Sequence, residues 1–527
     1  MSHIINKNWS AKSGQFAAAA LTALCSLLYI PPAQAAAPGI TGTSFNFSAE
    51  ANRISQPDGS SVYSWGYGCR TAPSGFSPAA IAGATCPTMQ IPGPTLIVRQ
   101  GDTVTVTLTN NLPAAAGNTS ILFPGFQVCA AVLNPDGSCP TVQTGVPGFL
   151  TREAAHGGSV TYSFVATTPG THSYYSGTQG DLQIEMGLYG AIIVLPTAVP
   201  AGCRALASTL PDGQTDYRNA AAAYNHSASC YDREYLFQFS EIDPRIHSQA
   251  EEQSGVACTQ PNGCMAVETE PYHPAYFMIN GRSMPDDMDP NYAVQYPHQP
   301  YNGNPHMHPG ELVLLRIIGT GRWQHPFHEH GNHVRILGRD GNLILSQADP
   351  TKLAGPLLFT TTTTPGLAMD GIFYWTGKGL NWDVYGHKGG DGSVCVPDAN
   401  GYYTADPMAP NYYEWCQDHN KALEAHPFGA VGSGGPVTLP DANILTNGAS
   451  YGGSPYLGPD ATARAVGPAG STPPSGTIAN SPAEEAAFAF MWHSHNEREI
   501  TTNNIFPGGM MMMMLVDPQT FQINEAN

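Results

Sequence analysis

The stretch His325-Pro-Phe-His-Glu-His-Gly331 contains a His-x-His pair, and Met491-Trp-His-Ser-His495 contains a second one far downstream. Residues two apart in a β-strand point to the same face of a sheet, so each pair predicts a strand that presents two imidazoles together. Two such strands side by side would direct four imidazoles into one volume. Because neutral imidazole is the commonest protein ligand for zinc, copper and iron, the two stretches predict a metal site. The alternative is a set of polar edge residues that merely cluster.

The pattern of apolar residues predicts an all-β fold. Val104, Val106 and Leu108 alternate with threonines, and residues 160–164 alternate in the same way, as expected of strands with one buried face. No clear 3.6-residue period occurs, and the 57 glycines and 46 prolines indicate many loops. We therefore expect antiparallel β-sandwich or barrel domains.

The first 35 residues are typical of a secretory signal peptide. Lys7 and Lys12 precede an apolar run over residues 16–30, and Ala33-Gln34-Ala35 is an Ala-x-Ala cleavage site. A membrane anchor is the alternative, but the run is short for crossing a bilayer, and no later stretch is apolar enough to do so. The sequence thus predicts an exported protein, periplasmic or extracellular, without a transmembrane segment.

Ten cysteines follow the predicted signal peptide, and an even number in an exported chain predicts disulfide bonds. Pairing each cysteine with its next neighbour along the chain closes the shortest loops. This hypothesis gives the pairs Cys69–Cys86, Cys129–Cys139, Cys203–Cys230, Cys258–Cys264 and Cys395–Cys416.

The charge of the chain limits its partners. With 21 basic and 40 acidic residues, the formal net charge is −19. This charge argues against nucleic acid or an anionic membrane as a partner, and it favours solubility and a weak attraction of cations. Metal ions and small molecules are the partners that we expect.

The two histidine motifs resemble those of the multicopper oxidase family, which carries His-Pro-x-His-x-His-Gly and, later, His-Cys-His ending in Gly-Met. The first motif is intact at 325–331, and Gly509-Met510 lies near the end of the second. The resemblance implies that His325 occupies a type 1 copper position. It assigns the positions of the trinuclear copper cluster to His328, His330, His493 and His495.

The N-terminal half is similar to the first domain of the same family. This similarity rests on Pro92-Gly-Pro-Thr-Leu96, Gly101-Asp102, Gly170-Thr171-His172 and Gly187-Leu-Tyr-Gly190. Leu122-Phe123-Pro124 stands where the family has His-Trp-His, and Tyr175-Ser176-Gly177 stands where a second His-x-His should follow. All four cluster histidines of the first domain are therefore missing, and His172 survives at a position that is not a ligand.

Two substitutions alter the type 1 position itself. Ser494 replaces the cysteine whose thiolate is the strong ligand of blue copper and its electron conduit to the cluster. The next type 1 histidine of the family lies five residues further on, where this chain has Glu499, and the segment from there to Met510 is several residues too long. We expect no blue copper centre and no four-electron reduction of dioxygen by the family mechanism.

A smaller site remains possible chemically. The four cluster imidazoles can hold one copper ion, or a close pair, because four nitrogens suit tetragonal Cu(II), although zinc accepts the same set. His325 either joins this site or hydrogen-bonds at its rim. Glu329, between two site histidines, should point to the opposite face of its strand. Glu497 and Glu499 either supply a hard ligand or, as we favour, form surface ion pairs.

Two weaker metal candidates complete the set. His306-Met307-His308 offers imidazole and thioether ligands that Cu(I) tolerates, with an exposed turn as the alternative. Met510 begins a run of five methionines in which 510, 512 and 514 would share one strand face. Because apolar residues continue the run, we favour a core role for this face over Cu(I) binding.

Composition and resemblance together predict the organisation of the chain. Two cupredoxin-like Greek-key domains are expected, as in two-domain laccases, and those relatives allow a trimer by analogy. For the stretch rich in Gly, Pro, Ser and Ala, we favour a loop insertion without a specific function over a lid that closes on a substrate. The predicted segments are a signal peptide (1–35), an extended leader (36–60), a first cupredoxin-like domain (61–198), a linker (199–228) and a second, copper-ligand domain (229–522) with the insertion at about 385–482.

The sequence as a whole predicts an exported copper-binding protein with a reduced histidine site. As an enzyme, it would be an oxidoreductase that acts on metal ions or small molecules. Two alternatives stay open: a non-enzymatic protein for copper binding or tolerance, and a metal-free cupredoxin scaffold.

Overall fold

In the computed structural model, the described residues from Ala37 onward belong to one compact unit. The predicted signal peptide lies outside the described residues, as does most of the predicted loop insertion. Within the described part of the chain, no helix is both long enough and apolar enough to cross a membrane. The structure describes residues 37–78, 81, 83–203, 208–209, 215–216, 221–378, 395–407, 409, 411–417, 453–457, 478–479, 488–517 and 523.

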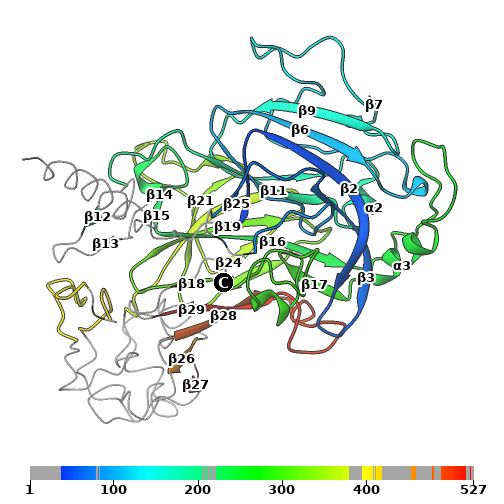
Figure 1. Ribbon diagram of the computed structural model, residues 1–527. Coiled ribbons are helices and arrows are strands. Elements are labelled where there is room, and N and C mark those ends of the chain that lie inside the picture. The colour runs from blue at the N-terminus through cyan, green and yellow to red at the C-terminus, as the bar shows by residue number, and fades with distance from the viewer. Residues whose placement is uncertain are drawn as a thin grey trace, which may run out of the picture. The chain divides into compact units, whose positions relative to one another are not determined.

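The first β-sandwich consists of two sheets from the N-terminal half (Figure 1). Val104, Val106 and Leu108 are buried, whereas the threonines at 105 and 107 are only partly buried, as the alternation predicts. One sheet has the order β3 (Ser61–Cys69), β2 (Ser44–Ser55), β6 (Thr103–Asn110), β9 (Ser159–Val165). The other has the order β10 (Gly170–Tyr175), β11 (Tyr189–Leu195), β5 (Leu96–Arg99), β1 (Gly39–Thr41), β4 (Gly75–Ser77).

The second β-sandwich is built in the same way. Its inner sheet has the order β17 (Tyr276–Ile279), β16 (Arg233–Ile242), β19 (Leu312–Gly319), β25 (Ala368–Tyr374), β21 (Val334–Arg339), β22 (Asn342–Leu343), and β23 (Leu357–Leu358) also pairs with β21. Its outer sheet has the order β18 (His306–Met307), β29 (Met511–Val516), β28 (Phe488–Ser494), β20 (Pro326–Glu329), β24 (Thr360–Thr362). One further strand, β26 (Gly453–Leu457), pairs with β28, and β27 (Ile478–Ala479) pairs with β26.

Short elements connect the sheets. Helix α3 begins after Asp243, whose side chain accepts a hydrogen bond from the backbone N–H of Arg245. The described helices are α2 (Gly180–Gln183), α3 (Pro244–Glu252), η1 (Ala114–Ala116), η2 (Ser227–Ser229) and η3 (Asp286–Met288). The short strands are β7 (Val146–Pro147), β8 (Arg152–Glu153), β12 (Ser208–Thr209), β13 (Thr215–Asp216), β14 (Ala221–Ala222) and β15 (Cys230–Tyr231). The all-β prediction is confirmed.

Two local expectations differ from the structure. The sheets are mixed rather than antiparallel, because β2 pairs with β6 and β16 pairs with β19 in parallel. Residues 36–60 were expected to form an extended leader, but β2 lies inside the first sandwich. Its side chains Phe45, Phe47 and Ala49 are buried in the first hydrophobic core, which holds this segment in the sheet.

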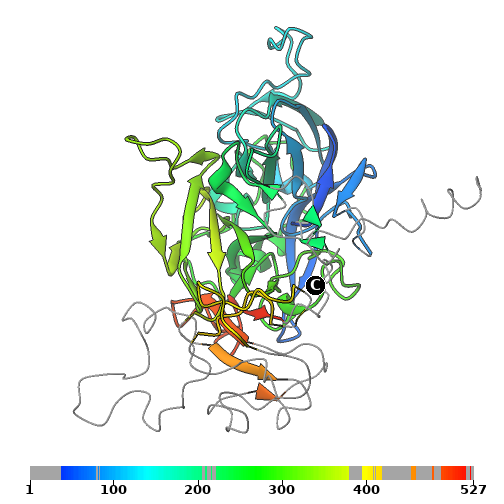
Figure 2. The same ribbon diagram turned by 90° about the vertical axis from the view of Figure 1, so that its left-hand side faces the viewer.

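The two sandwiches pack against each other. The contact joins the sheet of the first sandwich that contains β5 and β11 to the inner sheet of the second. Ile97, Ala191 and Ile193 from the first sandwich share one buried cluster with Ile318 and Ala368 from the second. Figures 1 and 2 show the outer sheet with β28 and β29 on the far side of the second sandwich from β6 and β9. The histidine-bearing strands therefore lie in the layer farthest from the first sandwich.

The five predicted disulfide pairs are confirmed by the structure. Each bridge joins neighbouring cysteines along the chain, over separations of 6 to 27 residues. The bridges are Cys69–Cys86, Cys129–Cys139, Cys203–Cys230, Cys258–Cys264 and Cys395–Cys416. Such bridges stabilise a chain chiefly by restricting its unfolded state.

Candidate metal centre

Strands β20 and β28 bring the two His-x-His pairs together. They run antiparallel, with Phe327 opposite Ser494 and His328 opposite His493. Because Phe327 and Trp492 are buried in the core of the second sandwich, the histidines that alternate with them project from the other side of the sheet. We call that side of the β18–β29–β28–β20–β24 sheet the outer face.

The four imidazoles of the outer face lie against one another. The ring centroids of His328 and His330 are 4.8 Å apart, and those of His493 and His495 are 5.4 Å apart. Across the two strands, His328 lies 4.9 Å from His495, and His330 lies 5.1 Å from His493. The Nε2 atoms of His330 and His493 are 3.2 Å apart. The structure thus gathers all four predicted cluster histidines into one group.

The closest pair of nitrogens fits a shared metal ion. Two nitrogens bound to one ion at about 2.0–2.1 Å in tetrahedral geometry lie about 3.3 Å from each other, close to the separation of His330 and His493. The Nδ1 atom of His493 lies 2.7 Å from the carbonyl oxygen of Ser494, and a hydrogen bond there leaves Nε2 as the ligand atom. Four imidazoles suit Cu(II) in tetragonal geometry and also suit zinc.

Burial keeps two of these imidazoles in the neutral form that binds metals. Desolvation, together with the neighbouring imidazoles, lowers the pKa of His328 to about 4. Desolvation also lowers the pKa of His493. Both rings are neutral at pH 7, so a metal ion would not have to displace protons from them.

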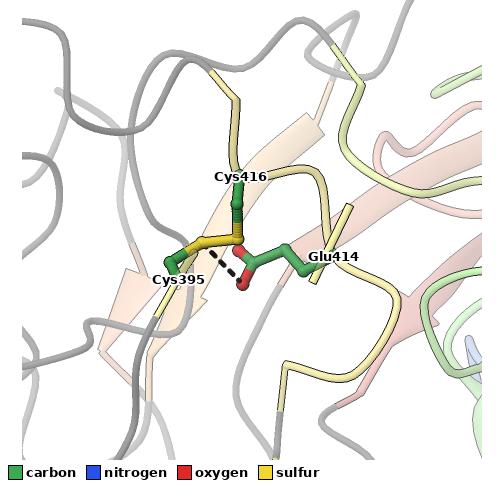
Figure 3. A group of neighbouring side chains, drawn as sticks. All are labelled: Cys395, Glu414 and Cys416. Carbon is green, nitrogen blue, oxygen red and sulfur yellow. Dashed lines mark hydrogen bonds between the residues drawn. A yellow bond between two sulfur atoms is a disulfide. The ribbon is translucent and has the colours of Figure 1, made fainter. Parts of the chain in front are cut away.

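The geometry also shows what metal binding would require. Among the described residues, donor atoms of three potential ligands lie within 4.8 Å of one another in Cys395, Glu414 and Cys416 (Figure 3). Those two sulfur atoms are bonded to each other, so this group is a disulfide beside a carboxylate. The outer-face imidazoles do not form so tight a group, and their convergence on one ion requires ring rotations.

His325 lies in a separate buried network. Its Nδ1 atom is 2.8 Å from Oε2 of Glu499, and its Nε2 atom is 2.9 Å from Oε2 of Glu241. Both ring nitrogens donate to carboxylates, which requires the imidazolium form. Burial opposes the charged ring, but the hydrogen bonds to Glu241 and Glu499 outweigh it and raise the pKa of His325 to about 9. His325 therefore does not join the imidazole group and does not lie at its rim.

The residues at the expected type 1 positions do lie together. The Ser494 hydroxyl donates to Oε2 of Glu499, which also accepts from His325. The backbone N–H of Met510 donates to the carbonyl oxygen of Glu499. This arrangement corrects the expectation for Glu499, which is fully buried and does not form a surface ion pair. A serine, an imidazolium and a carboxylate do not fit a blue copper ion, which needs a thiolate and neutral imidazoles.

Copper-loaded protein is expected to show no intense blue absorption, because Ser494 cannot give thiolate charge transfer. Ser494→Cys alone is not expected to restore this intense blue absorption, since Glu499 occupies the second imidazole position. Visible absorption spectra of the two copper-loaded proteins check both statements. An intense blue band in the unmodified protein would mean that the type 1 positions are assigned incorrectly.

The weaker metal candidates are buried, and the two histidines among them lie beside different carboxylates. Nδ1 of His306 lies 2.7 Å from Oδ2 of Asp517. Nδ1 of His308 lies 3.1 Å from Oε1 of Glu311, which also forms an ion pair with Arg233. His306 and His308 therefore have different carboxylate partners and do not form an exposed turn. Met510 lies in the hydrophobic core, as favoured from the sequence.

Glu329 faces the interior of the second sandwich, opposite to its neighbouring histidines. Its side chain is fully buried and accepts a hydrogen bond from the hydroxyl of Thr361. Burial raises the pKa of Glu329 to about 8, so this carboxyl is largely protonated at pH 7. The predicted orientation is correct, and the side chain does not point toward the imidazoles.

The first-domain positions expected from the resemblance hold no metal ligands. Leu122 forms an isolated backbone bridge with Tyr175, and Phe123 is buried in the first core. His172 is also buried, with Nε2 3.0 Å from the carbonyl oxygen of Thr168. These side chains have structural roles in the first sandwich.

Sequence reasoning missed Glu241, the second carboxylate partner of His325. Its Oε1 atom accepts hydrogen bonds from the backbone N–H groups of Arg322 and Trp323. A signal was available, because Glu241 stands at the end of a strand that carries the apolar residues Leu236, Phe237 and Phe239. A charged residue buried in such a strand requires a partner.

Comparisons with known proteins agree with this fold. Family models described as multicopper oxidase match residues 84–198 and 268–366, one in each sandwich. Laccase 1 of Metarhizium acridum is 35% identical over 107 residues, which make up 20% of this chain and 15% of the relative. Copper resistance protein A of Pseudomonas syringae pv. tomato is 34% identical over 104 residues, 20% of this chain and 14% of the relative. The match thus spans a small part of these relatives.

Solved structures match more of the chain, at lower identity. A blue copper oxidase from Nitrosomonas europaea is 16% identical, with a TM-score of 0.44, and the match covers 90% of this chain and 85% of that protein. The two family-model matches carry the assignment, since each falls within one sandwich of the expected kind. The chain belongs to the multicopper oxidase family.

Proposed function

We propose that this chain binds copper through the four imidazoles of the outer face, without a blue copper centre. The observation that carries the proposal is the approach of Nε2 of His330 to Nε2 of His493, at 3.2 Å, within a group of four imidazoles. Burial, which lowers the pKa of both His328 and His493, supports it, because neutral imidazole is the ligand form. One copper ion per chain is the stoichiometry that this group suits, and a close pair is the alternative.

As an enzyme, the protein would be an oxidoreductase that acts on metal ions or small molecules. Bound copper would supply one-electron redox chemistry at this site. The chain's own residues would hold the ion and give access to it, because His495 is exposed to solvent whereas His328 packs against the ring of Phe359 at 5.6 Å. A small reductant would thus approach from the side of His495.

Copper binding without turnover is the second candidate. It is favoured by the network of His325, Ser494 and Glu499, which occupies the positions from which electrons enter the cluster in the resemblance. Without that entry, the outer face would serve copper storage or tolerance. A metal-free scaffold is the third outcome, and it predicts a folded protein that does not retain copper.

Export and assembly belong to the same proposal. The five disulfide bridges support an oxidising compartment, periplasmic or extracellular, which the signal sequence predicts. Trimerisation is carried over by analogy with two-domain laccases. Analytical ultracentrifugation of the purified protein would test the trimer directly.

Mature protein loaded with Cu(II) is expected to bind about one nitrogen-ligated copper per chain, because the imidazoles can replace the hydration shell of one ion. The quadruple variant His328→Ala, His330→Ala, His493→Ala, His495→Ala is expected to lose it. Metal analysis and electron paramagnetic resonance measure both results. His333→Ala is the matched control, since this nearby imidazole also contacts Phe359 but lies outside the group.

The outcomes separate the candidates. Nitrogen-ligated Cu(II) retained by a folded quadruple variant would refute the proposed site. No copper in the unmodified protein would favour the metal-free scaffold. Where copper is bound, oxygen consumption with a phenolic reductant or with Cu(I) distinguishes an oxidoreductase from a binding protein.

A further inference from the structure

The five-methionine run divides between the two sides of strand β29. Met510, Met512 and Met514 are buried in the core of the second sandwich. Met511 and Met513 alternate with them and therefore project from the outer face, the side that carries the imidazoles. From the sequence, Met510, Met512 and Met514 were the residues considered for Cu(I) binding. In the structure, Met511 and Met513 are the two that lie on the side of the imidazoles.

A third methionine joins this pair from the neighbouring strand. Met491 precedes His493 by two residues on β28, so both project from the outer face. The strand register places Met491 opposite Met513 and His493 opposite Met511. Directly opposite residues have Cβ atoms about 4.5–5.5 Å apart, and diagonal neighbours about 7–8 Å apart, so long side chains such as these three can meet.

The surroundings of the three thioethers differ from those of the core methionines. Met511 is 4% exposed, and Met491 and Met513 are partly exposed. The same row of the sheet continues from Met511 through His493 to His328 and then to Thr360. Soft thioether sulfur beside imidazole is a donor set that selects Cu(I) over divalent ions.

We propose that Met491, Met511 and Met513 form a Cu(I)-binding site on the outer face, beside the imidazole group. Three neutral thioethers stabilise the monovalent ion and bind hard or divalent cations poorly. The position of Met511 opposite His493 puts this site next to the imidazoles. The proposal goes beyond the proposed function and does not require the imidazole group to hold a metal.

Cu(I) binding can be measured anaerobically by competition with bathocuproine disulfonate, and copper X-ray absorption reports sulfur ligands. The unmodified protein is expected to show copper–sulfur scattering. The variant Met491→Leu, Met511→Leu, Met513→Leu is expected to lose that scattering and to bind Cu(I) more weakly, by about tenfold or more.

A matched control lies on the same strand. Met512→Leu, Met514→Leu changes two core methionines, and such volume-conserving exchanges cost less than about 1.5 kcal/mol of stability. This control is expected to keep both Cu(I) affinity and sulfur scattering. Equal losses in the two variants, unchanged affinity in the outer-face variant, or nitrogen-only ligation in the unmodified protein would each overturn the proposal.

The two proposed copper sites can be refuted independently of each other. If the thioether site is real and the imidazole site is not, the quadruple histidine variant keeps its sulfur-ligated Cu(I) and the unmodified protein shows no nitrogen-ligated Cu(II). If only the imidazole site is real, the outer-face methionine variant keeps its Cu(II) resonance and its Cu(I) affinity. The second result would refute this inference and leave the proposed function standing.

Discussion

His325→Leu is expected to lower the free energy of unfolding by about 3–5 kcal/mol, the usual cost of removing one partner from a buried ion pair. The leucine would leave Glu241 and Glu499 without their shared cation. The loss is costly because both carboxylates remain buried. The hydroxyl of Ser494 and the side-chain amide of Asn496 would still donate to Glu499, but neither brings a positive charge. Denaturant unfolding of the two proteins measures the difference.

A compensated variant tests the cause of this loss. Adding Glu241→Gln and Glu499→Gln to His325→Leu removes the unpaired charges, so part of the stability is expected to return. His333→Leu, a partly buried histidine without a described carboxylate partner, is the control and is expected to change stability by about 1 kcal/mol or less. A loss below about 1 kcal/mol in His325→Leu itself would show that the triad of His325, Glu241 and Glu499 is not strongly ion-paired.

The same triad makes stability depend on pH. The pKa of His325 is raised to about 9 in the folded protein, whereas histidine in an unfolded chain titrates near 6.5. A raised pKa contributes stability that is fully present below pH 6.5 and is lost as the pH rises through 9. The stability difference between the unmodified protein and His325→Leu should therefore shrink over this range. Buried Glu185, with a pKa raised to about 8, adds a slope of the same sign to both proteins.

The imidazole group was predictable from the sequence because its geometry is local. A two-residue period fixes which side chains share a strand face, and each His-x-His pair needs no other information. The register that sets His328 opposite His493 extends the same rule across one strand pair. The triad of His325, Glu241 and Glu499 was predictable only in part. The resemblance places His325 and Glu499 together at type 1 positions, but it gives no position to Glu241, which lies 84 residues before His325. Tertiary packing brings Glu241 to this site.

The fold shows the same division between local and distant information. Alternation identified strands such as β6, but it does not state which strands pair or in which direction, and the parallel pair of β16 and β19 was therefore missed. Strand β2 carries the alternating residues Phe45 and Phe47, a signal that was present in the segment assigned to a leader. Burial of those rings could only be seen once their partners in the first core were in place.

Arg316→Met is expected to lower the free energy of unfolding by about 3–5 kcal/mol, because Arg316 is a fully buried cation at the junction of the two sandwiches. Its Nε atom donates to Glu234 at 2.7 Å, and its Nη1 atom lies 3.3 Å from Oδ1 of Asp370. Nη1 also donates, at 3.0 Å, to the hydroxyl of Thr171, which lies on β10 of the first sandwich. Removal of the guanidinium would leave two buried carboxylates with less compensation.

Asp370 makes the junction a network and not a single ion pair. It accepts hydrogen bonds from the backbone N–H of Thr171 at 3.0 Å and from the hydroxyl of Tyr224 at 2.6 Å. One carboxylate on β25 therefore holds Arg316 of its own sheet and Thr171 of the other sandwich. Because the network contacts both sandwiches, Arg316→Met should weaken their coupling as well as the second sandwich itself.

Equilibrium unfolding with one probe in each sandwich tests this account. The triple variant Arg316→Met, Glu234→Gln, Asp370→Asn is expected to recover part of the loss, since no unpaired charge would remain buried. Arg335→Met, on strand β21 of the same sheet, is the matched control, because this partly exposed arginine donates to the carbonyl oxygen of Gly355 and has no described carboxylate partner. Equal losses in Arg316→Met and Arg335→Met would contradict the argument, since burial and pairing are what distinguish the two arginines.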